Sequence, residues 1–228
     1  MIAALQKISK YYTQPSSSER LEVLKEITFS LEHNDKIAII GPSGSGKSTF
    51  LNILGTLDIP TSGTVFIDER DVNSLPADEL AAIRNRFIGF VFQQHYLLPQ
   101  LTLWENILLP TIPIKDKMLK KESQGHARRL LQQTGLEKFM NRLPAQLSLG
   151  ECQRAAVIRA LVNKPRLLLA DEPTGSLDRQ NALNLTQLLL ELSKEQQTAL
   201  MVVTHSAEVA GKMDIIYKLN AGTLQRMN

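Results

Sequence analysis

The stretch GPSGSGKST, from Gly41 to Thr49, decides the expected fold of this chain. It matches the pattern G-x-x-x-x-G-K-[ST] in full, and this pattern holds phosphate where it joins a strand to a helix. That context is present, because the apolar run Ile37–Ile40 precedes it and the helical-looking segment Ser48–Leu57 follows it. A flexible Gly/Ser turn with a stray lysine would not account for both neighbours. The sequence therefore predicts a nucleoside triphosphate site.

Each residue type in this loop has a chemical purpose. The glycines let the backbone curl so that successive amides converge on phosphate oxygens. Lys47 supplies a positive charge for the β- and γ-phosphates, and the Ser48 hydroxyl is a ligand for Mg²⁺. The residues expected to hold the nucleotide are Gly41, Pro42, Ser43, Gly44, Ser45, Gly46, Lys47, Ser48 and Thr49.

Short apolar runs predict a buried sheet around this loop. Each run is too short for a typical helix and is bounded by polar or turn residues. The amphipathic segment Asn181–Leu192 precedes the last of them, and strands that alternate with helices predict a largely parallel α/β core. The four runs are Ile37–Ile40, Ile88–Phe92, Leu167–Ala170 and Leu200–Val203.

The flanking segments have a different pattern. Leu21–Leu31 and Gly63–Ile67 alternate as exposed strands do, while Ile215–Leu219 and Thr223–Gln225 surround an Asn-Ala-Gly turn. We expect these segments to form an antiparallel edge layer. The middle of the chain, roughly Thr102–Val162, has helical periodicity and predicts an inserted helical lobe. The expected fold is an α/β P-loop NTPase with a mixed sheet.

Composition limits the classes of function. The chain has 228 residues and a net charge of +3, with 26 basic and 23 acidic residues, which is too mild to predict nucleic-acid binding. Cys152 is the only cysteine, so no intrachain disulfide is possible and a reducing compartment is expected. The sequence has neither a signal peptide nor a membrane span, which predicts a cytoplasmic protein. Thr13–Arg20, with Ser16 to Ser18, predicts a polar loop.

Two adjacent acids follow the apolar strand in RLLLADEP, Arg166 to Pro173. Side chains at the carboxyl ends of parallel strands point into the ligand site. Asp171 is therefore expected to hold Mg²⁺ through water, and Glu172 to orient and deprotonate an attacking water. His205 ends the next strand and is expected to contact the γ-phosphate. The remaining histidines, His33, His95 and His126, have no such context and are expected at the surface.

The stretch LSLGECQR, Leu147 to Arg154, predicts the start of a helix. Ser148 and Glu151 have the spacing of a capping box. A helix N-terminus is also an anion site, because its first amides are unpaired and its dipole is positive there. Ser148 can thus cap the helix and face a phosphate.

Together these motifs make the chain similar to the ATP-binding subunits of ABC transporters over essentially its whole length. LSLGECQR matches the signature of that family, Ser176–Asp178 (SLD) its D-loop, and His205 its switch histidine. Gln93 falls at the Q-loop glutamine, and Tyr12 at the aromatic residue that stacks on adenine. The resemblance implies a fold of the ABC ATPase type in one domain, 1–228. Its nucleotide-binding core would comprise 1–92 and 163–228, and its helical signature lobe 93–162.

The resemblance also implies a homodimer of ATPase subunits that sandwiches two ATP molecules. Gln93 would sense Mg²⁺ and the γ-phosphate, and Asp178 would lie at the dimer interface. The residues expected to act on the nucleotide of the partner are Ser148, Gly150 and Glu151. The expected metal ligands are Ser48, Gln93 and Asp171, and the expected catalytic residues are Glu172 and His205.

The same resemblance implies that the chain powers an integral membrane permease from the cytoplasmic face of the inner membrane. The segments GTLDIPTSG and ADEPTGSLDRQNA are most similar to cassettes of lipoprotein release, and macrolide-export and cell-division cassettes are the alternatives. A soluble ABC ATPase for DNA or ribosomes usually carries a coiled-coil insertion or a second cassette, and this chain has room for neither. A silent binding module would not need Glu172 and His205.

One departure from the family pattern LSGGQ is Leu149, which replaces the first glycine. Gly150 is retained, so we expect the Leu149 side chain to point away from the nucleotide. Cys152, after Glu151, is expected on the helix surface. Trp104 has two open interpretations, a contact with the permease or packing in the core of the lobe.

Overall fold

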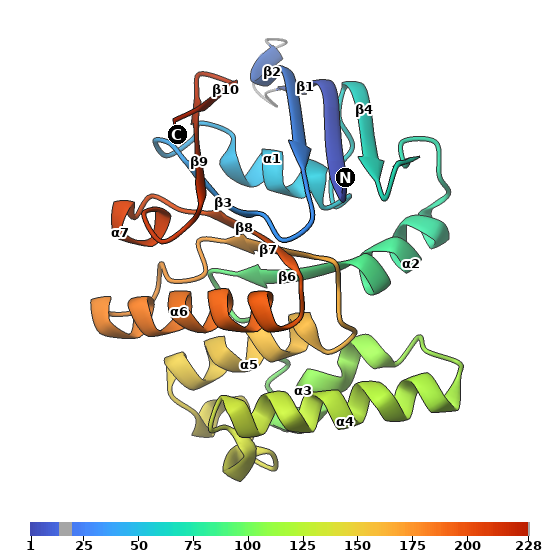
Figure 1. Ribbon diagram of the computed structural model, residues 1–228, viewed down its shortest axis with the longest axis vertical. Coiled ribbons are helices and arrows are strands. Elements are labelled where there is room, and N and C mark those ends of the chain that lie inside the picture. The colour runs from blue at the N-terminus through green and yellow to red at the C-terminus, as the bar shows by residue number, and fades with distance from the viewer. Residues whose placement is uncertain (14–19, 228) are drawn as a thin grey trace.

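The computed structural model describes residues 1–13 and 20–227. The polar loop expected at Thr13–Arg20, including Ser16 to Ser18, lies outside the described residues except at its two ends. The chain is arranged in layers, with an antiparallel sheet above, a mostly parallel sheet in the middle and helices below (Figure 1).

The predicted parallel core is confirmed. Its six strands pair in the order β10-β9-β3-β8-β7-β6, and all neighbours are parallel except the terminal hairpin. Their bounds are β3 (Lys36–Ile40), β6 (Ile88–Phe92), β7 (Leu167–Asp171), β8 (Ala199–Val203), β9 (Ile215–Asn220) and β10 (Thr223–Arg226). The antiparallel sheet has the order β2-β1-β4-β5, with β1 (Ala3–Thr13), β2 (Arg20–Leu31), β4 (Ser62–Ile67) and β5 (Arg70–Asp71).

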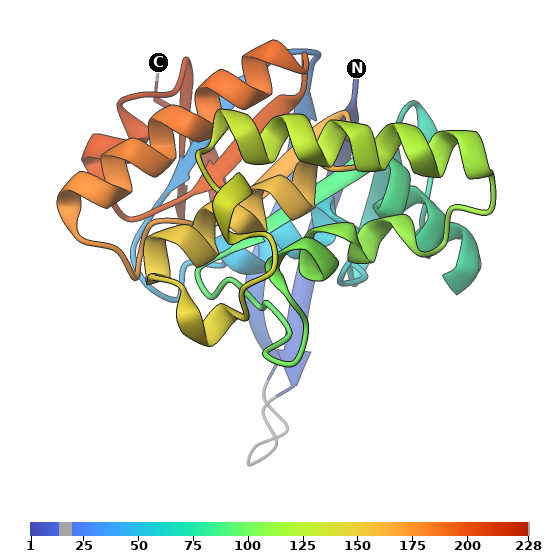
Figure 2. The same cartoon turned by 90° about the horizontal axis from the view of Figure 1, so that it is seen from below.

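Helices cover both faces of the core sheet. α1 lies between the two sheets, whereas α5 and α6 cross the opposite face and α3 and α4 lie beyond them (Figures 1 and 2). The α-helices are α1 (Lys47–Leu54), α2 (Ala77–Phe87), α3 (Leu103–Leu108), α4 (Lys117–Gln133), α5 (Leu149–Leu161), α6 (Arg179–Glu195) and α7 (Ala207–Ala210). Short 3₁₀ turns are η1 (Leu109–Thr111), η2 (Glu137–Phe139) and η3 (Pro144–Gln146). No helix of the described residues is long and apolar enough to cross a membrane.

The central core strands β3, β6, β7 and β8 are mainly apolar because both of their faces are buried. In β7, Leu167 and Leu169 pack in the cluster shared with α1 and the antiparallel sheet. Leu168 and Ala170 alternate with them and pack in the cluster shared with α5 and α6. A strand with two buried faces needs no polar residue in alternation, which explains the continuous apolar runs.

The prediction for the C-terminal hairpin was wrong. β9 and β10 do form a hairpin, but β9 pairs in parallel with β3, so the hairpin extends the core sheet and is not part of the antiparallel layer. The residues of the turn predicted the pairing of β9 with β10. The other neighbour of β9 is β3, which is distant in sequence and could not be predicted from the turn. The other two segments predicted for the antiparallel layer do lie there, as β2 and β4. Both pair with Ala3–Thr13, a strand that the sequence pattern did not indicate.

Two surface assignments were also wrong. His126 is 7% exposed, because it lies on the inner face of α4. Cys152 is 3% exposed and its Sγ lies 3.6 Å from the carbonyl of Pro144. Burial raises the pKa of the Cys152 thiol, and the charge of Glu151 raises it further, which opposes the reactivity that a helix N-terminus can give. His33 is exposed and His95 is half-buried.

Candidate active site

The phosphate loop has the backbone shape that its glycines permit. Gly46 has φ 97° and caps the N-terminus of α1, and a Cβ there would lie 2.8 Å from Val23 Cγ1. A Cβ on Gly41 would lie 2.2 Å from the carbonyl oxygen of Leu219. No side chain caps α1, so its first amides remain available to an anion.

Lys47 is held within this loop. Its ammonium donates to the carbonyl oxygens of Gly41 and Pro42, both at 3.0 Å, and the side chain is buried. A buried cation whose partners are neutral carbonyls remains available to an anionic ligand. The ammonium and the unpaired amides of α1 therefore make this end of the loop electropositive.

A cavity of about 530 Å³ opens in front of the loop. Its walls come from the phosphate loop and from the ends of three core strands, because parallel strands end at the same edge of a sheet. Gln93 follows β6, Glu172 follows β7 and His205 follows β8. The lining residues are Val23, Ser43, Gly44, Gly46, Lys47, Ser48, Thr49, Gln93, Glu172 and His205.

Glu172 and His205 contact each other in this cavity. His205 Nδ1 lies 2.9 Å from Glu172 Oε2, and the His205 backbone amide donates to the same oxygen at 3.4 Å. Glu172 has φ 46°, a left-handed conformation that costs energy for a residue with a Cβ. Its amide donates to the carbonyl of Val203 at 2.9 Å, which fixes the backbone at this turn. These hydrogen bonds hold Glu172 in its strained conformation, with its carboxylate in the wall of the cavity.

Asp171, the last residue of β7, is half-buried and interacts with the hydroxyl of Ser48. Burial raises the pKa of Asp171; the hydroxyl of Ser48 opposes this rise, and the charge of Glu172 adds to it. The Asp171 Oδ1 atom is buried without a hydrogen-bond partner among the described residues. A buried, unpaired carboxylate oxygen next to a hydroxyl can accept a cation.

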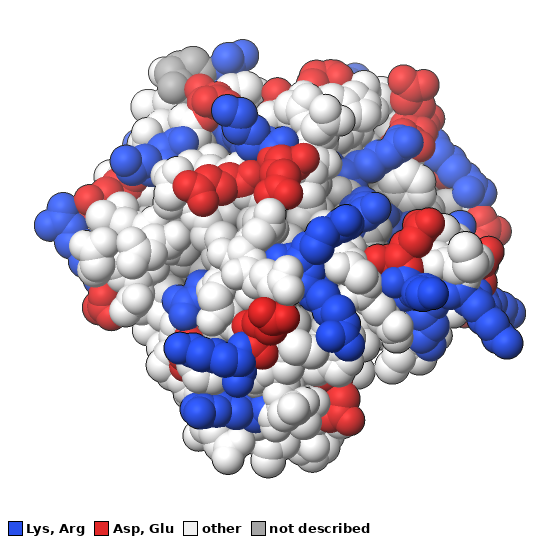
Figure 3. Space-filling view, turned by 60° about the horizontal axis from the view of Figure 1, so that its bottom comes forward, with Lys and Arg blue, Asp and Glu red and all other residues white. Residues whose placement is uncertain are grey.

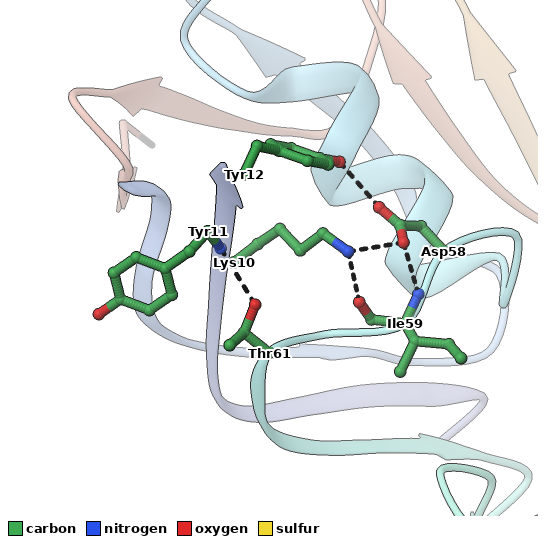
Figure 4. A network of polar contacts seen from close by, with 6 residues as sticks. All are labelled: Lys10, Tyr11, Tyr12, Asp58, Ile59 and Thr61. Carbon is green, nitrogen blue, oxygen red and sulfur yellow. Dashed lines mark hydrogen bonds and ion pairs between the residues drawn. The ribbon is translucent and has the colours of Figure 1, made fainter. Parts of the chain in front are cut away.

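Tyr12 lies at the side of the site, at the end of β1. Its hydroxyl donates to Asp58 Oδ2 at 2.8 Å and also interacts with Thr49, which lines the cavity. The ammonium of Lys10 donates to Asp58 Oδ1 at 2.7 Å, so two side chains of β1 converge on one carboxylate (Figure 4). Tyr12 is 41% exposed. Its predicted stacking on adenine stays a prediction.

The signature residues lie elsewhere in the molecule. The capping box predicted at Ser148 and Glu151 is confirmed, since the Glu151 amide donates to Ser148 Oγ and the Ser148 amide to Glu151 Oε2. Leu149 is 45% exposed. Gly150 lines a separate cavity of about 340 Å³ that contains none of the phosphate loop. The N-terminus of α5 therefore lines a cavity other than the one in front of the phosphate loop of its own chain.

Asp178 caps the neighbouring helix α6. Its Oδ1 accepts a hydrogen bond from the Asn181 backbone amide at 3.0 Å. The hydrogen bonds from the backbone and the side chain of Asn181 lower the pKa of the Asp178 carboxyl. Asn181 lines the same separate cavity as Gly150. The N-termini of α5 and α6 thus meet on one face.

Sequence reasoning missed Gln153. Its Nε2 donates to the carbonyls of Phe92 and Pro173, at 2.6 and 2.9 Å, so one buried amide joins the residues next to Gln93 and Glu172. The sequence offered one indication that Gln153 is buried, since its amide side chain lies on the same face of α5 as the small apolar residue Ala156. Trp104 is half-buried against the core of the lobe, with the guanidinium of Arg128 5.1 Å from its ring.

Charge on the helical side of the molecule is mixed. On the face in Figure 3, Lys and Arg side chains are interspersed with Asp and Glu. A nucleic-acid clamp is built instead from a basic stripe on one face.

Comparisons with known proteins bear on this site. A family model described as ABC transporter matches residues 24–175. The lipoprotein-releasing system ATP-binding protein LolD of Legionella pneumophila (strain Paris) is 44% identical over 224 residues, which cover 98% of this chain and 97% of that protein. The macrolide export ATP-binding/permease protein MacB of Rhodopirellula baltica is 46% identical over 202 residues, 89% of this chain but 30% of that protein.

Solved structures show the same likeness. The dimeric structure of MJ0796, a bacterial ABC transporter cassette, has a TM-score of 0.87 and 39% identity, and covers 100% of this chain and 99% of that one. A dimeric post-hydrolysis state of MJ0796 bound to ADP and Pi has a TM-score of 0.85 and 38% identity, with the same coverage.

Proposed function

This chain belongs to the ABC transporter family, and from that premise we propose that it is the ATP-hydrolysing subunit of a transporter that releases lipoproteins from the inner membrane. The observation that carries the proposal is the cavity of about 530 Å³, around which Lys47, Glu172 and His205 converge from three elements. The chain and LolD also match over nearly the full length of both. For the macrolide-export alternative the match is shorter, because it covers only 30% of the MacB protein.

We assign ATP to this cavity. The loop amides and Lys47 hold the β- and γ-phosphates, and His205 is placed to contact the γ-phosphate. Glu172 orients and deprotonates the attacking water. The contact between His205 and Glu172 Oε2 holds the carboxylate at the cavity wall before the water arrives.

The donor set beside the cavity fits Mg²⁺, a hard cation that takes oxygen ligands and keeps several waters at phosphate sites. Ser48, Asp171 and Gln93 would hold it, with the unpaired Asp171 Oδ1 as the buried donor. When bound, Mg²⁺ would supply positive charge to the β- and γ-phosphate oxygens.

We infer that two copies of the chain close around two ATP molecules. The α5 N-terminus carries Ser148 and lines a cavity that contains no residue of its own phosphate loop, so we assign to its anion site a nucleotide from another copy. MJ0796, at 39% identity, is dimeric. Ser148, Gly150 and Glu151 would then act across the interface, and Asp178 would lie within it.

The partner is an integral membrane permease at the cytoplasmic face of the inner membrane. The printed name of LolD, ATP-binding protein of a lipoprotein-releasing system, supports a permease as a separate chain. The helical lobe, residues 93–162, is the part that we assign to contact with the permease.

The proposal is tested by trapping the closed dimer. Glu172→Gln should still bind ATP and dimerise, because the binding residues remain. It should hydrolyse ATP at least about 100-fold more slowly than the wild type, because the base is lost. Glu32→Gln, an exposed carboxylate that pairs with the terminal amine, is the matched control and should hydrolyse ATP normally. Normal turnover by Glu172→Gln would remove Glu172 from the mechanism.

Release of a labelled lipoprotein from inner-membrane vesicles tests the transported substrate. The vesicles should contain the chain and its co-expressed permease. ATP-dependent release that is lost with Lys47→Ala supports the proposal, whereas macrolide efflux without lipoprotein release would favour the alternative.

A further inference from the structure

Three polar side chains form a closed network beside the candidate ATP cavity. Lys10 and Tyr12 come from the end of β1, and Asp58 comes from the turn after α1 (Figure 4). Residues i and i+2 of a strand project from the same face, so Lys10 and Tyr12 lie next to each other. Both extend toward Asp58 in Figure 4.

Asp58 is the centre of this network. It accepts hydrogen bonds from the Tyr12 hydroxyl at 2.8 Å, the Lys10 ammonium at 2.7 Å and the Ile59 amide at 2.7 Å. Partial burial alone would raise the pKa of Asp58, but the bonds from Lys10, Tyr12 and Ile59 together hold it below its ordinary value. The carboxylate is therefore ionised and fully engaged with donors.

Lys10 covers one face of the Tyr12 ring. Its ammonium lies 5.0 Å from the ring centroid, a cation–π distance, and its side chain is only 12% exposed. The same ammonium donates to the carbonyl of Ile59 at 2.7 Å, which keeps it in place. Tyr12 is nevertheless 41% exposed, so Lys10 leaves part of this residue open to solvent.

The ring is also tied to the phosphate loop. Its hydroxyl interacts with Thr49, and Thr49 lines the ATP cavity. A fixed aromatic ring next to a triphosphate site can stack a base, and fixing it in advance lowers the conformational entropy lost on binding.

We propose that Asp58 and Lys10 are positioning residues that hold the Tyr12 ring as a one-sided platform, on which the purine base stacks against the face opposite Lys10. The proposal rests on the proposed ATP site and adds to it the residues that orient the base. The rival explanation is purely structural: the ion pair merely fastens β1 to the turn after α1. That role would affect folding and phosphate binding as much as base binding.

Steady-state ATP hydrolysis separates the two explanations. Asp58→Ala should raise the KM for ATP about 3- to 10-fold and leave kcat within about 2-fold, because the ring is freed while the phosphate residues are untouched. Asp58→Asn, which keeps an acceptor for Lys10, should fall between Asp58→Ala and the wild type. Glu79→Ala removes a comparable ion pair with Arg70 and should change neither constant.

Two further measurements identify the base as the group affected. Inorganic tripolyphosphate has no base, so its inhibition constant should be the same for the wild type and Asp58→Ala. In a Tyr12→Ala background, Asp58→Ala should add less than about 2-fold to KM, because the platform is already absent. Equal loss of tripolyphosphate and ATP binding, or independent effects in the double variant, would overturn the proposal.

Failure of the ATP site itself would look different. If the wild type bound neither ATP nor tripolyphosphate, the proposed function would fall. Normal hydrolysis with an unchanged KM in Asp58→Ala would refute the platform alone.

Discussion

Replacing Gln153 with methionine tests whether one buried amide braces the active site. Gln153 lies on α5 with 1% of its surface exposed, and it donates to the carbonyls of Phe92 and Pro173. These carbonyls lie at the ends of neighbouring parallel strands, directly before Gln93 and two residues after Asp171. Methionine has nearly the same length and volume but no donor, so the change removes hydrogen bonds and leaves the packing similar.

The expected loss of stability follows from the contacts. Leaving a buried acceptor without its donor costs about 1–3 kcal/mol, so two carbonyls cost about 2–6 kcal/mol. The Gln153 Oε1 atom is itself buried without a partner, and its removal returns about 1–2 kcal/mol. The difference between the midpoints of these two ranges, about 4 and about 1.5 kcal/mol, gives a net loss of about 2.5 kcal/mol in the free energy of unfolding. This corresponds to a Tm roughly 5–10 °C lower for a chain of this size.

Urea unfolding of the apo protein, followed by circular dichroism, measures this difference. The matched control is Gln187→Met on α6, where an exposed glutamine bonds only to Glu191 one helical turn away. The control should change the free energy of unfolding by less than about 0.5 kcal/mol. If Gln153→Met is as mild as the control, the two carbonyls have other donors and the brace does not exist.

Other features of the site give shorter tests. Burial raises the pKa of Asp171 in the folded state above its value in the unfolded chain, so the folded state holds this proton more tightly. The free energy of unfolding therefore falls as pH rises from the unfolded pKa through the folded pKa. Asp171→Asn should therefore stabilise the apo protein at pH 7.5 by on the order of 1 kcal/mol, a gain that shrinks toward acid pH; a destabilised variant at pH 7.5 would contradict this. Cys152 is buried with a raised pKa, so a thiol reagent should label it only after denaturation; rapid labelling of the native protein would show local opening. Leu149 is 45% exposed, so Leu149→Gly should leave ATPase activity equal or higher; a several-fold loss would reveal a contact across the dimer interface.

The sequence predicted the parts of the molecule that follow from local chemistry. The phosphate loop needs its glycines and lysine in a fixed order, and the apolar runs around it predicted the parallel strands correctly. The capping box at Ser148 was also readable, because the residues that form it lie within one turn of helix. The prediction failed where a strand pairs with another that is distant in sequence. The pairing of β9 with β3 was not predicted, and neither was the strand Ala3–Thr13.

Burial was the second limit. His126 and Cys152 were expected at the surface from their residue types, yet each lies on the inner face of its helix. Which side of a helix faces inward depends on the elements packed against it, and a single polar residue does not indicate this.

The sequence by itself thus determined what the site can bind, since a phosphate loop, a pair of acids and a histidine are sufficient to specify a nucleoside triphosphate. Only the tertiary structure decided which residues act together. It brought Glu172 within 2.9 Å of His205, joined the ends of β6 and β7 through Gln153 and fixed Tyr12 through Asp58. The physical reason is that hydrogen bonds and burial act across space, between strands and helices that the chain connects only through long crossovers.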